Sequence, residues 1–184
     1  MTSRPTLVVV SGPAGSGKTT LAHTIARAVG CPAICRDEIK EGMVHTTPGV
    51  VAGPGDELTA RTLPVFFAVL ELLLTAGVTT VAEAAFQDKV WRPRLEPLRP
   101  LAQIRIVQCV TSADVALERQ LRRRQDNPLR RAHADPGPGD VAEHAERWAA
   151  FDRVRMDAPS IEVDTSDGYR PRLEEIVAFA GGRR

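Results

Sequence analysis

Near its start, the sequence carries glycine, lysine and threonine residues at a spacing that can bind phosphate. Gly12, Gly17, Lys18 and Thr19 follow the pattern Gly-x4-Gly-Lys-Thr, which is typical of a phosphate-binding loop. Glycine permits positive φ angles, so successive backbone N–H groups can face one anion. Lys18 can reach the β- and γ-phosphates of ATP, and the Thr19 hydroxyl can ligate Mg²⁺. We expect ATP and Mg²⁺ as cofactors, held by Gly12, Pro13, Ala14, Gly15, Ser16, Gly17, Lys18, Thr19 and Thr20.

A charged segment, residues 36–41, follows the short apolar run 33–35. A carboxylate at Asp37 could accept the proton of an attacking hydroxyl, as phosphoryl transfer to an alcohol requires. Capping of a helix N-terminus is an equally good interpretation of Asp37. Arg36 and Lys40 flank it and could bind substrate or orient the γ-phosphate, unless they lie on a solvated helix face.

Glu83 ends another apolar run, residues 78–82. A charged residue at the end of a buried strand beside a phosphate site could hold Mg²⁺ through water, or orient Arg36 or Lys40. The alternative is a structural partner for a buried arginine, because buried glutamates are almost always paired.

Arginines gather further along the chain, at residues 119, 122, 123, 124, 130 and 131. Arg119 and Arg123 are four residues apart, so they share one face of a helix. Guanidinium groups can neutralise the charge that develops on a transferred phosphoryl group, and a loop that carries them can close over the nucleotide. We expect Arg119 and Arg123 to bind nucleotide, with Arg123 in a catalytic role. A solvated or RNA-binding surface is the alternative.

The elements that must position these side chains alternate along the chain. Apolar runs predict strands, charged amphipathic stretches predict helices, and residues 42–56, rich in Gly, Pro and Thr, predict a loop. The alternation favours a parallel sheet covered by helices on both faces, with ligands at the carboxyl ends of its strands. Strands are predicted at 7–10, 33–35, 78–82, 104–110 and 160–163, and helices at 18–29, 58–76, 113–124, 140–154 and from Pro171 to Ala180.

The composition suits one soluble domain of 184 residues with 43% hydrophobic residues and a net charge of +1. A net charge of +1 is too small to attract nucleic acid over the whole protein surface. No apolar run approaches the length needed to span a membrane. The N-terminus lacks a signal-peptide pattern, and three cysteines argue against a disulfide framework, so we expect a cytoplasmic protein. The spacing of Cys31 and Cys35 does not predict zinc. His45 and His133 are expected to be exposed loop residues without a catalytic role.

Five segments together resemble the P-loop small kinases, in particular zeta-toxin and chloramphenicol-phosphotransferase-like kinases and the kinase domain of phage polynucleotide 5′-kinase. The segments are 8–20, 35–38, 81–86, 118–123 and 163–169. The resemblance implies a three-layer α/β P-loop NTPase fold, with five parallel strands in nucleoside-monophosphate-kinase order. It implies one domain over 1–184, with a substrate-binding insertion at about 38–62 and a helical lid at about 119–142.

The resemblance also implies roles for individual residues. Asp37 is the general base, Arg119 packs near adenine and Arg123 reaches phosphate. Glu83 stands where polynucleotide-kinase-like sequences usually have Asp.

These observations predict an ATP-dependent kinase that phosphorylates a hydroxyl of a small molecule, such as an antibiotic, a nucleoside or a sugar-like metabolite. The acceptor is expected between residues 37–62 and Glu83, in contact with Arg36, Asp37 and Lys40. A polynucleotide 5′-hydroxyl kinase or RNA-repair factor is an alternative, although eight aromatic residues are few for stacking bases. A nucleotide-dependent regulatory ATPase is an alternative of another class.

Overall fold

The computed structural model describes residues 4–47, 49, 56–126, 133, 145–146 and 148–181, with the side chain of residue 124 left out. The strands are β1 (Thr6–Ser11), β2 (Ala33–Cys35), β3 (Thr80–Glu83), β4 (Gln103–Val110) and β5 (Ser160–Asp164). The helices are α1 (Lys18–Val29), α2 (Arg36–His45), α3 (Glu57–Thr75), α4 (Asp88–Leu95), the 3₁₀ turn η1 (Glu96–Leu98), α5 (Ala113–Asp126) and α7 (Leu173–Phe179).

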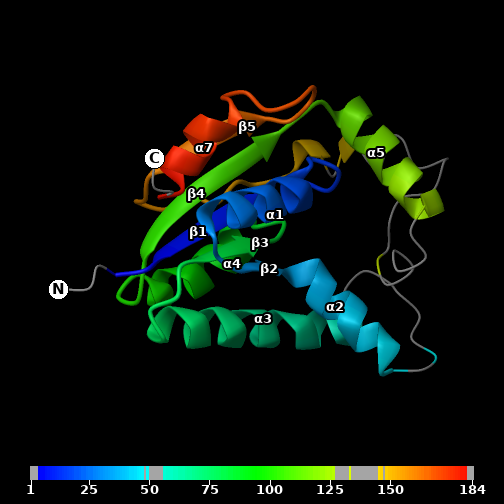
Figure 1. Ribbon diagram of the computed structural model, residues 1–184. Coiled ribbons are helices and arrows are strands. Elements are labelled where there is room, and N and C mark those ends of the chain that lie inside the picture. The colour runs from blue at the N-terminus through cyan, green and yellow to red at the C-terminus, as the bar shows by residue number, and fades with distance from the viewer. Residues whose placement is uncertain are drawn as a thin grey trace.

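The five strands form one parallel sheet in the order β2-β3-β1-β4-β5. The central strand β1 is buried on both faces, which explains its continuous run of Leu and Val. The fold class predicted from the alternating pattern is therefore confirmed. All five strands point the same way, so the segments that follow them meet at one edge (Figure 1).

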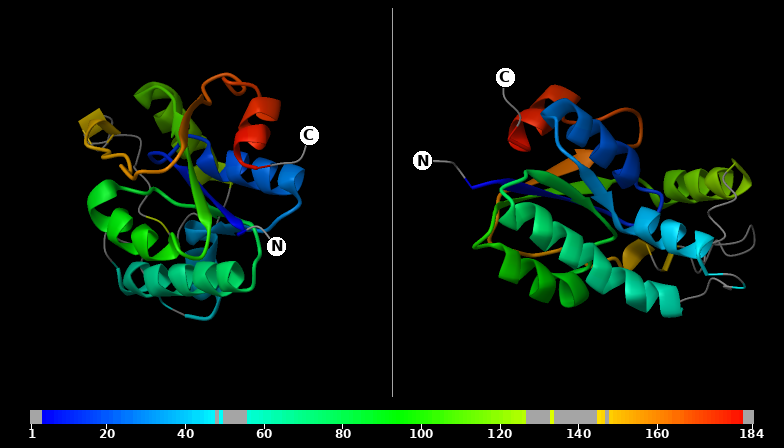
Figure 2. Two further views of the ribbon diagram at one scale, coloured as in Figure 1. Left: turned by 90° about the vertical axis from the view of Figure 1, so that its left-hand side faces the viewer. Right: turned by 60° about the horizontal axis from the view of Figure 1, so that its bottom comes forward.

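Helices cover both faces of the sheet (Figures 1 and 2). α1 and α7 pack on one face, where Leu21, Ile25 and Ile176 are fully buried. α3 and α4 pack on the other face around an aromatic cluster, in which the Phe86 and Trp91 ring centroids lie 4.6 Å apart. α2 and α5 project beyond the carboxyl ends of the strands and flank the predicted site (Figure 1).

Two predicted element boundaries were wrong. α2 continues to His45 inside the predicted loop 42–56, because it packs on α3, where the Thr62 hydroxyl donates to Met43 Sδ at 3.7 Å. The helix predicted for 140–154 does not reach its expected end. The Asp88 backbone N–H donates to the Asp152 carbonyl, so the chain there pairs with the start of α4 instead of continuing its helix. Residues 140–144 and 147 of that prediction lie outside the described residues.

By length and composition α3 could cross a membrane, contrary to the sequence expectation. In this fold one face of α3 covers the sheet through the fully buried Phe66 and Leu70. Its other face is open, with Leu72 70% exposed. Burial therefore accounts for the apolar residues of the first face, whereas Leu72 and Val65 on the other face are exposed.

Candidate functional site

The loop between β1 and α1 has the shape of a phosphate cradle. Gly15 and Gly17 adopt positive φ angles of 83° and 75°, and a Cβ at Gly15 would overlap the backbone of Ala116. Gly17 is the N-cap of α1 and supplies no side-chain cap, which leaves first-turn N–H groups open to an anion. Within the described part of the chain, the buried Ser16 hydroxyl has no hydrogen-bond partner. The loop therefore fits a bound phosphate chain.

Glu83 lies directly beside the functional side chains of this loop. Its Oε2 accepts a hydrogen bond from the Thr19 hydroxyl at 3.2 Å, and its Oε1 lies 3.7 Å from Lys18 Nζ. The side chain is only 2% exposed, and this burial raises the pKa of Glu83, an effect opposed by the Lys18 ammonium. The sequence left open whether Glu83 holds Mg²⁺, orients Arg36 or Lys40, or pairs with a buried arginine. In the structure its side chain contacts Lys18 and Thr19. A hydroxyl and a carboxylate so placed are ligands that suit Mg²⁺.

One cavity of about 500 Å³ opens on the α5 side of the loop. Residues of the loop line this cavity together with Arg119 and Arg123, the two arginines predicted to bind nucleotide. Its lining is Gly15, Gly17, Thr20, Arg119, Arg122, Arg123, Thr165, Gly168 and Tyr169. We call it the donor cavity, because the phosphate-binding backbone forms one of its walls.

A second cavity of about 480 Å³ lies on the other side of the loop, between α2, α3 and α4. Lys18 forms part of its wall, so the two cavities meet at the phosphate-binding loop. Its lining is Ala14, Lys18, Arg36, Asp37, Thr59, Ala60, Leu63, Ala85, Val90, Trp91 and His133. We call it the acceptor cavity. Arg36 and Asp37, which are predicted to bind substrate, both line this cavity, and their contact with substrate stays a prediction.

Hydrogen bonds join helix α5, the segment Thr165–Ser166 and the phosphate-binding loop. Arg119 Nη2 donates to the Thr165 and Ser166 carbonyls, at 2.6 and 3.0 Å. The buried Gln120 donates to the Ala14 carbonyl at 3.1 Å, and the Thr165 hydroxyl donates to the Ser16 carbonyl at 2.7 Å. Sequence reasoning missed Gln120 and did not single out Thr165, because their partners lie more than a hundred residues away along the chain.

Asp37 lies in the first turn of α2, where it contacts two basic side chains. Arg36 Nη1 is 3.1 Å from Asp37 Oδ1, and His133 Nδ1 is 4.0 Å from Asp37 Oδ2. His133 also reaches Glu41 Oε1 at 3.0 Å. The expectation that His133 is exposed was wrong, since its side chain is 10% exposed. It lies in the predicted lid, so one residue of that segment contacts the acceptor cavity.

Lys40 is absent from the described lining of the acceptor cavity. Its Nζ lies 2.7 Å from Asp56 Oδ2 and donates to Thr59 at 2.9 Å, with 3% of the side chain exposed. These bonds join α2 to the start of α3, so the structure gives Lys40 a structural role. Its predicted substrate contact stays a prediction. Residues 130 and 131 of the arginine cluster lie outside the described residues, as do 48 and 50–55 of the proposed insertion and 127–132 and 134–142 of the proposed lid.

Comparison with known proteins supports the fold. A crystal structure of a Chloroflexus aurantiacus protein provisionally assigned as a kinase matches with a TM-score of 0.85 and 23% identity, over 97% of this chain and 98% of that one. A Sinorhizobium meliloti gluconokinase matches with a TM-score of 0.55 and 21% identity, over 96% and 89%. The Mycobacterium tuberculosis APS kinase CysC, in complex with AMPPNP and APS, matches with a TM-score of 0.59 and 15% identity, over 97% and 99%.

Sequence comparison agrees with the structural matches. Among the curated proteins none matches this sequence. A family model described as an AAA domain, AAA_33, matches residues 7–148, which is well over half of the chain. The resemblance to P-loop small kinases is confirmed: this chain belongs to the AAA_33 family and is a P-loop kinase in fold.

Proposed function

We propose that this protein is a cytoplasmic, ATP- and Mg²⁺-dependent phosphotransferase whose acceptor is a hydroxyl of a small molecule. One observation carries the proposal: two cavities meet at the phosphate-binding loop, and Lys18 lines the second of them. A nucleotide-dependent switch needs only the donor cavity. A transferase needs both, with the transferred group between them. All three cysteines are unbridged, in keeping with a reducing compartment.

On the donor side, the open N–H groups of the loop and the Lys18 ammonium bind the β- and γ-phosphates. The Thr19 hydroxyl would hold Mg²⁺ directly, with the Glu83 carboxylate acting through water. Mg²⁺ held there would supply positive charge to the phosphate oxygens. Arg119 and Arg123 line the donor cavity, where Arg119 packs beside adenine and Arg123 stabilises the charge of the transferred group.

On the acceptor side, Asp37 acts as the general base. Its carboxylate accepts the proton of the acceptor hydroxyl while that oxygen bonds to the γ-phosphorus. The bond from the γ-phosphorus to the β,γ-bridging oxygen breaks, and its electron pair leaves with ADP. Arg36, 3.1 Å from Asp37, holds the carboxylate in place through an ion pair and contacts the acceptor.

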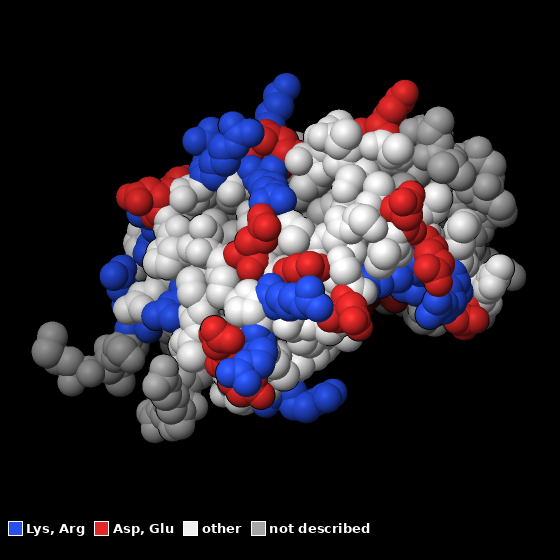
Figure 3. All heavy atoms as spheres, turned by 90° about the horizontal axis from the view of Figure 1, so that it is seen from above, with Lys and Arg blue, Asp and Glu red and all other residues white. Residues whose placement is uncertain are grey.

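The lining of the acceptor cavity favours an alcohol with an apolar face. Its lining combines the polar Asp37, Arg36 and Thr59 with Trp91, Leu63 and other apolar side chains. A hydroxylated antibiotic or a nucleoside matches this mixed lining better than a highly charged polymer. The face that carries α1 and α7 also mixes acidic and basic side chains over its described surface (Figure 3).

The test is a transfer screen with γ-labelled ATP over nucleosides, aminoglycosides, sugars and oligonucleotide 5′ ends. We expect label on a small molecule, and loss of that label in Asp37→Asn. The control is Asp157→Asn, an exposed carboxylate in the lining of a different cavity. Label only on oligonucleotide ends would identify a polynucleotide kinase. Hydrolysis of ATP without transfer to any acceptor would favour the regulatory ATPase.

A further inference from the structure

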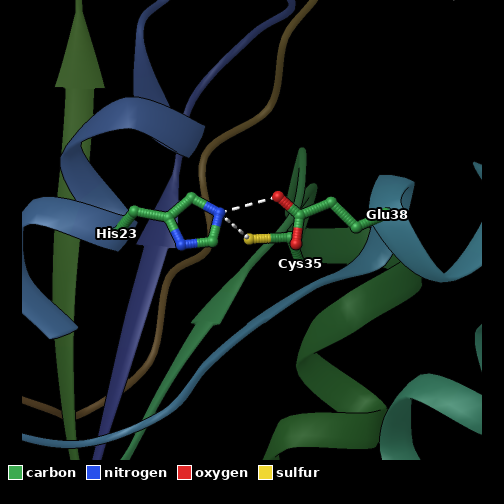
Figure 4. A group of neighbouring side chains, drawn as sticks. All are labelled: His23, Cys35 and Glu38. Carbon is green, nitrogen blue, oxygen red and sulfur yellow. Dashed lines mark hydrogen bonds and ion pairs between the residues drawn. The ribbon is translucent and has the colours of Figure 1, made fainter. Parts of the chain in front are cut away.

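Three side chains with metal-binding atoms converge just behind the catalytic site. His23 comes from α1, Cys35 ends β2 and Glu38 lies in the first turn of α2 (Figure 4). Their ligand atoms all lie within 4.8 Å of one another. We propose that His23, Cys35 and Glu38 form a binding site for a zinc-type divalent cation. The proposal does not depend on the proposed phosphotransferase function.

The distances suit a tetrahedral ion. His23 Nε2 lies 3.6 Å from Cys35 Sγ. Zn–S and Zn–N bonds of about 2.3 and 2.0 Å at a tetrahedral angle give an S···N separation of about 3.5 Å. His23 Nε2 and Glu38 Oε1 are hydrogen-bonded at 2.7 Å, and this distance must lengthen by about half an ångström for both to bind one zinc ion.

The exposure of the three side chains allows that adjustment. Cys35 is buried at the end of a sheet strand, so its sulfur is a fixed point. His23 and Glu38 are 44% and 48% exposed, so both can turn without displacing the core. The exposed side of the triad leaves room for a water as fourth ligand, as in zinc sites with three protein ligands.

The local charge also favours a cation. Two carboxylates, Glu38 and the buried Glu83, interact electrostatically with the Cys35 sulfur, and a ligand oxygen of Glu38 lies within 4.8 Å of it. Metal binding breaks the S–H bond, forms the S–metal bond and releases the proton to solvent. The resulting thiolate between two carboxylates is compensated by the divalent charge. A sulfur, imidazole and carboxylate set suits zinc, whereas Mg²⁺ prefers an all-oxygen shell.

A metal here would tie together the two helices that frame the catalytic site. His23 lies on the helix that begins at Lys18, and Glu38 is the neighbour of Asp37. Binding to the folded state would raise the melting temperature, since His23 is twelve residues from Cys35 along the chain and meets it only when α1 packs on the sheet. This stabilisation can be measured without nucleotide or acceptor.

The test uses the full-length, metal-free protein with Zn²⁺ in competition with a chromophoric chelator, in the presence of excess Mg²⁺. We expect one equivalent of Zn²⁺ to bind, a higher melting temperature, and a thiolate-to-metal absorption band when Co²⁺ replaces Zn²⁺. Cys35→Ser should abolish the band, and His23→Gln should weaken binding about tenfold or more. Because His23 is exposed, its variant stays informative if Cys35→Ser fails to fold.

Cys31→Ser and His45→Gln are the matched controls, since neither residue belongs to the triad. Both should bind Zn²⁺ like the wild type. Failure of the wild-type protein to bind one equivalent would overturn the proposal. So would unchanged binding in His23→Gln, or a Co²⁺ band that disappears in Cys31→Ser instead of Cys35→Ser.

Discussion

The buried pair of Lys18 and Glu83 leads to a quantitative prediction about the protein without nucleotide. At 3.7 Å and an effective dielectric constant of about 20, the Coulomb attraction of the two charges is about 4.5 kcal/mol. Part of this is offset by the cost of burying the carboxylate. Removal of one partner leaves the other charge uncompensated, which costs about 3–5 kcal/mol in buried pairs. Lys18→Met leaves the buried Glu83 carboxylate without its cation and should therefore lower the free energy of unfolding by about 3 kcal/mol at mildly alkaline pH. Glu83→Gln should cost less, because it removes a buried charge.

A double-mutant cycle with Lys18→Met separates the pair from other contacts. Urea unfolding at mildly alkaline pH, followed by circular dichroism, gives the free energy of unfolding for the wild type, both single variants and the double variant. Because the double variant leaves neither charge stranded, it should lose less stability than the two single variants together, with a coupling of about 2–4 kcal/mol.

Glu57 and Arg61 provide a control at almost the same separation. Their charged atoms lie 3.8 Å apart, but on the exposed surface of α3, where the side chains are 86% and 54% exposed. Solvent screening should hold the coupling of this pair to about 0.5 kcal/mol or less. A coupling that small for Lys18 and Glu83 would refute the argument that burial strengthens their interaction.

Three further predictions follow from the site. Burial raises the pKa of Glu83, so above its ordinary value of 4.5 the folded state binds more protons than the unfolded state. The free energy of unfolding should therefore fall as the pH rises from 4.5 through the pKa of Glu83 in the folded state. We would measure it by urea unfolding at a series of pH values, and the same pH dependence in wild type and Glu83→Gln would contradict this prediction. Gly15→Ala should cost more stability in urea unfolding than Gly30→Ala: both glycines have positive φ, but only at Gly15 does a Cβ overlap the Ala116 backbone. Asp37→Asn should lower kcat by about 10²–10⁴-fold and leave the Kd for ATP unchanged in calorimetry, whereas a wild-type kcat would remove the general-base role.

Local sequence was enough for the phosphate-binding loop because each of its features acts over a few residues. Glycines at fixed offsets set the backbone, and Lys18 and Thr19 follow at the start of a helix. The alternation of strands and helices likewise fixed the sheet type, because only a parallel sheet accommodates repeated crossovers. Asp37 and Glu83 could be predicted at the ligand edge for the same reason, since both follow parallel strands.

Other features depended on contacts between distant segments. Lys40 has the sequence context of a substrate ligand, yet its ammonium group donates hydrogen bonds to Asp56 and Thr59. Both partners are at least sixteen residues away, so no local pattern predicts these bonds. His133 resembles an exposed loop histidine until the fold brings it within contact of Asp37.

The sequence by itself determined the fold class, the family and the phosphate-binding loop of this protein, because short-range spacing and periodicity encode all three. Only the tertiary structure decided which residues share a cavity and which carboxylate pairs with Lys18. It alone brought His23 beside Cys35, since helix α1 must first pack against the sheet for an imidazole to meet a thiol at the end of β2. The spacing of the cysteines along the chain does not predict this contact between His23 and Cys35.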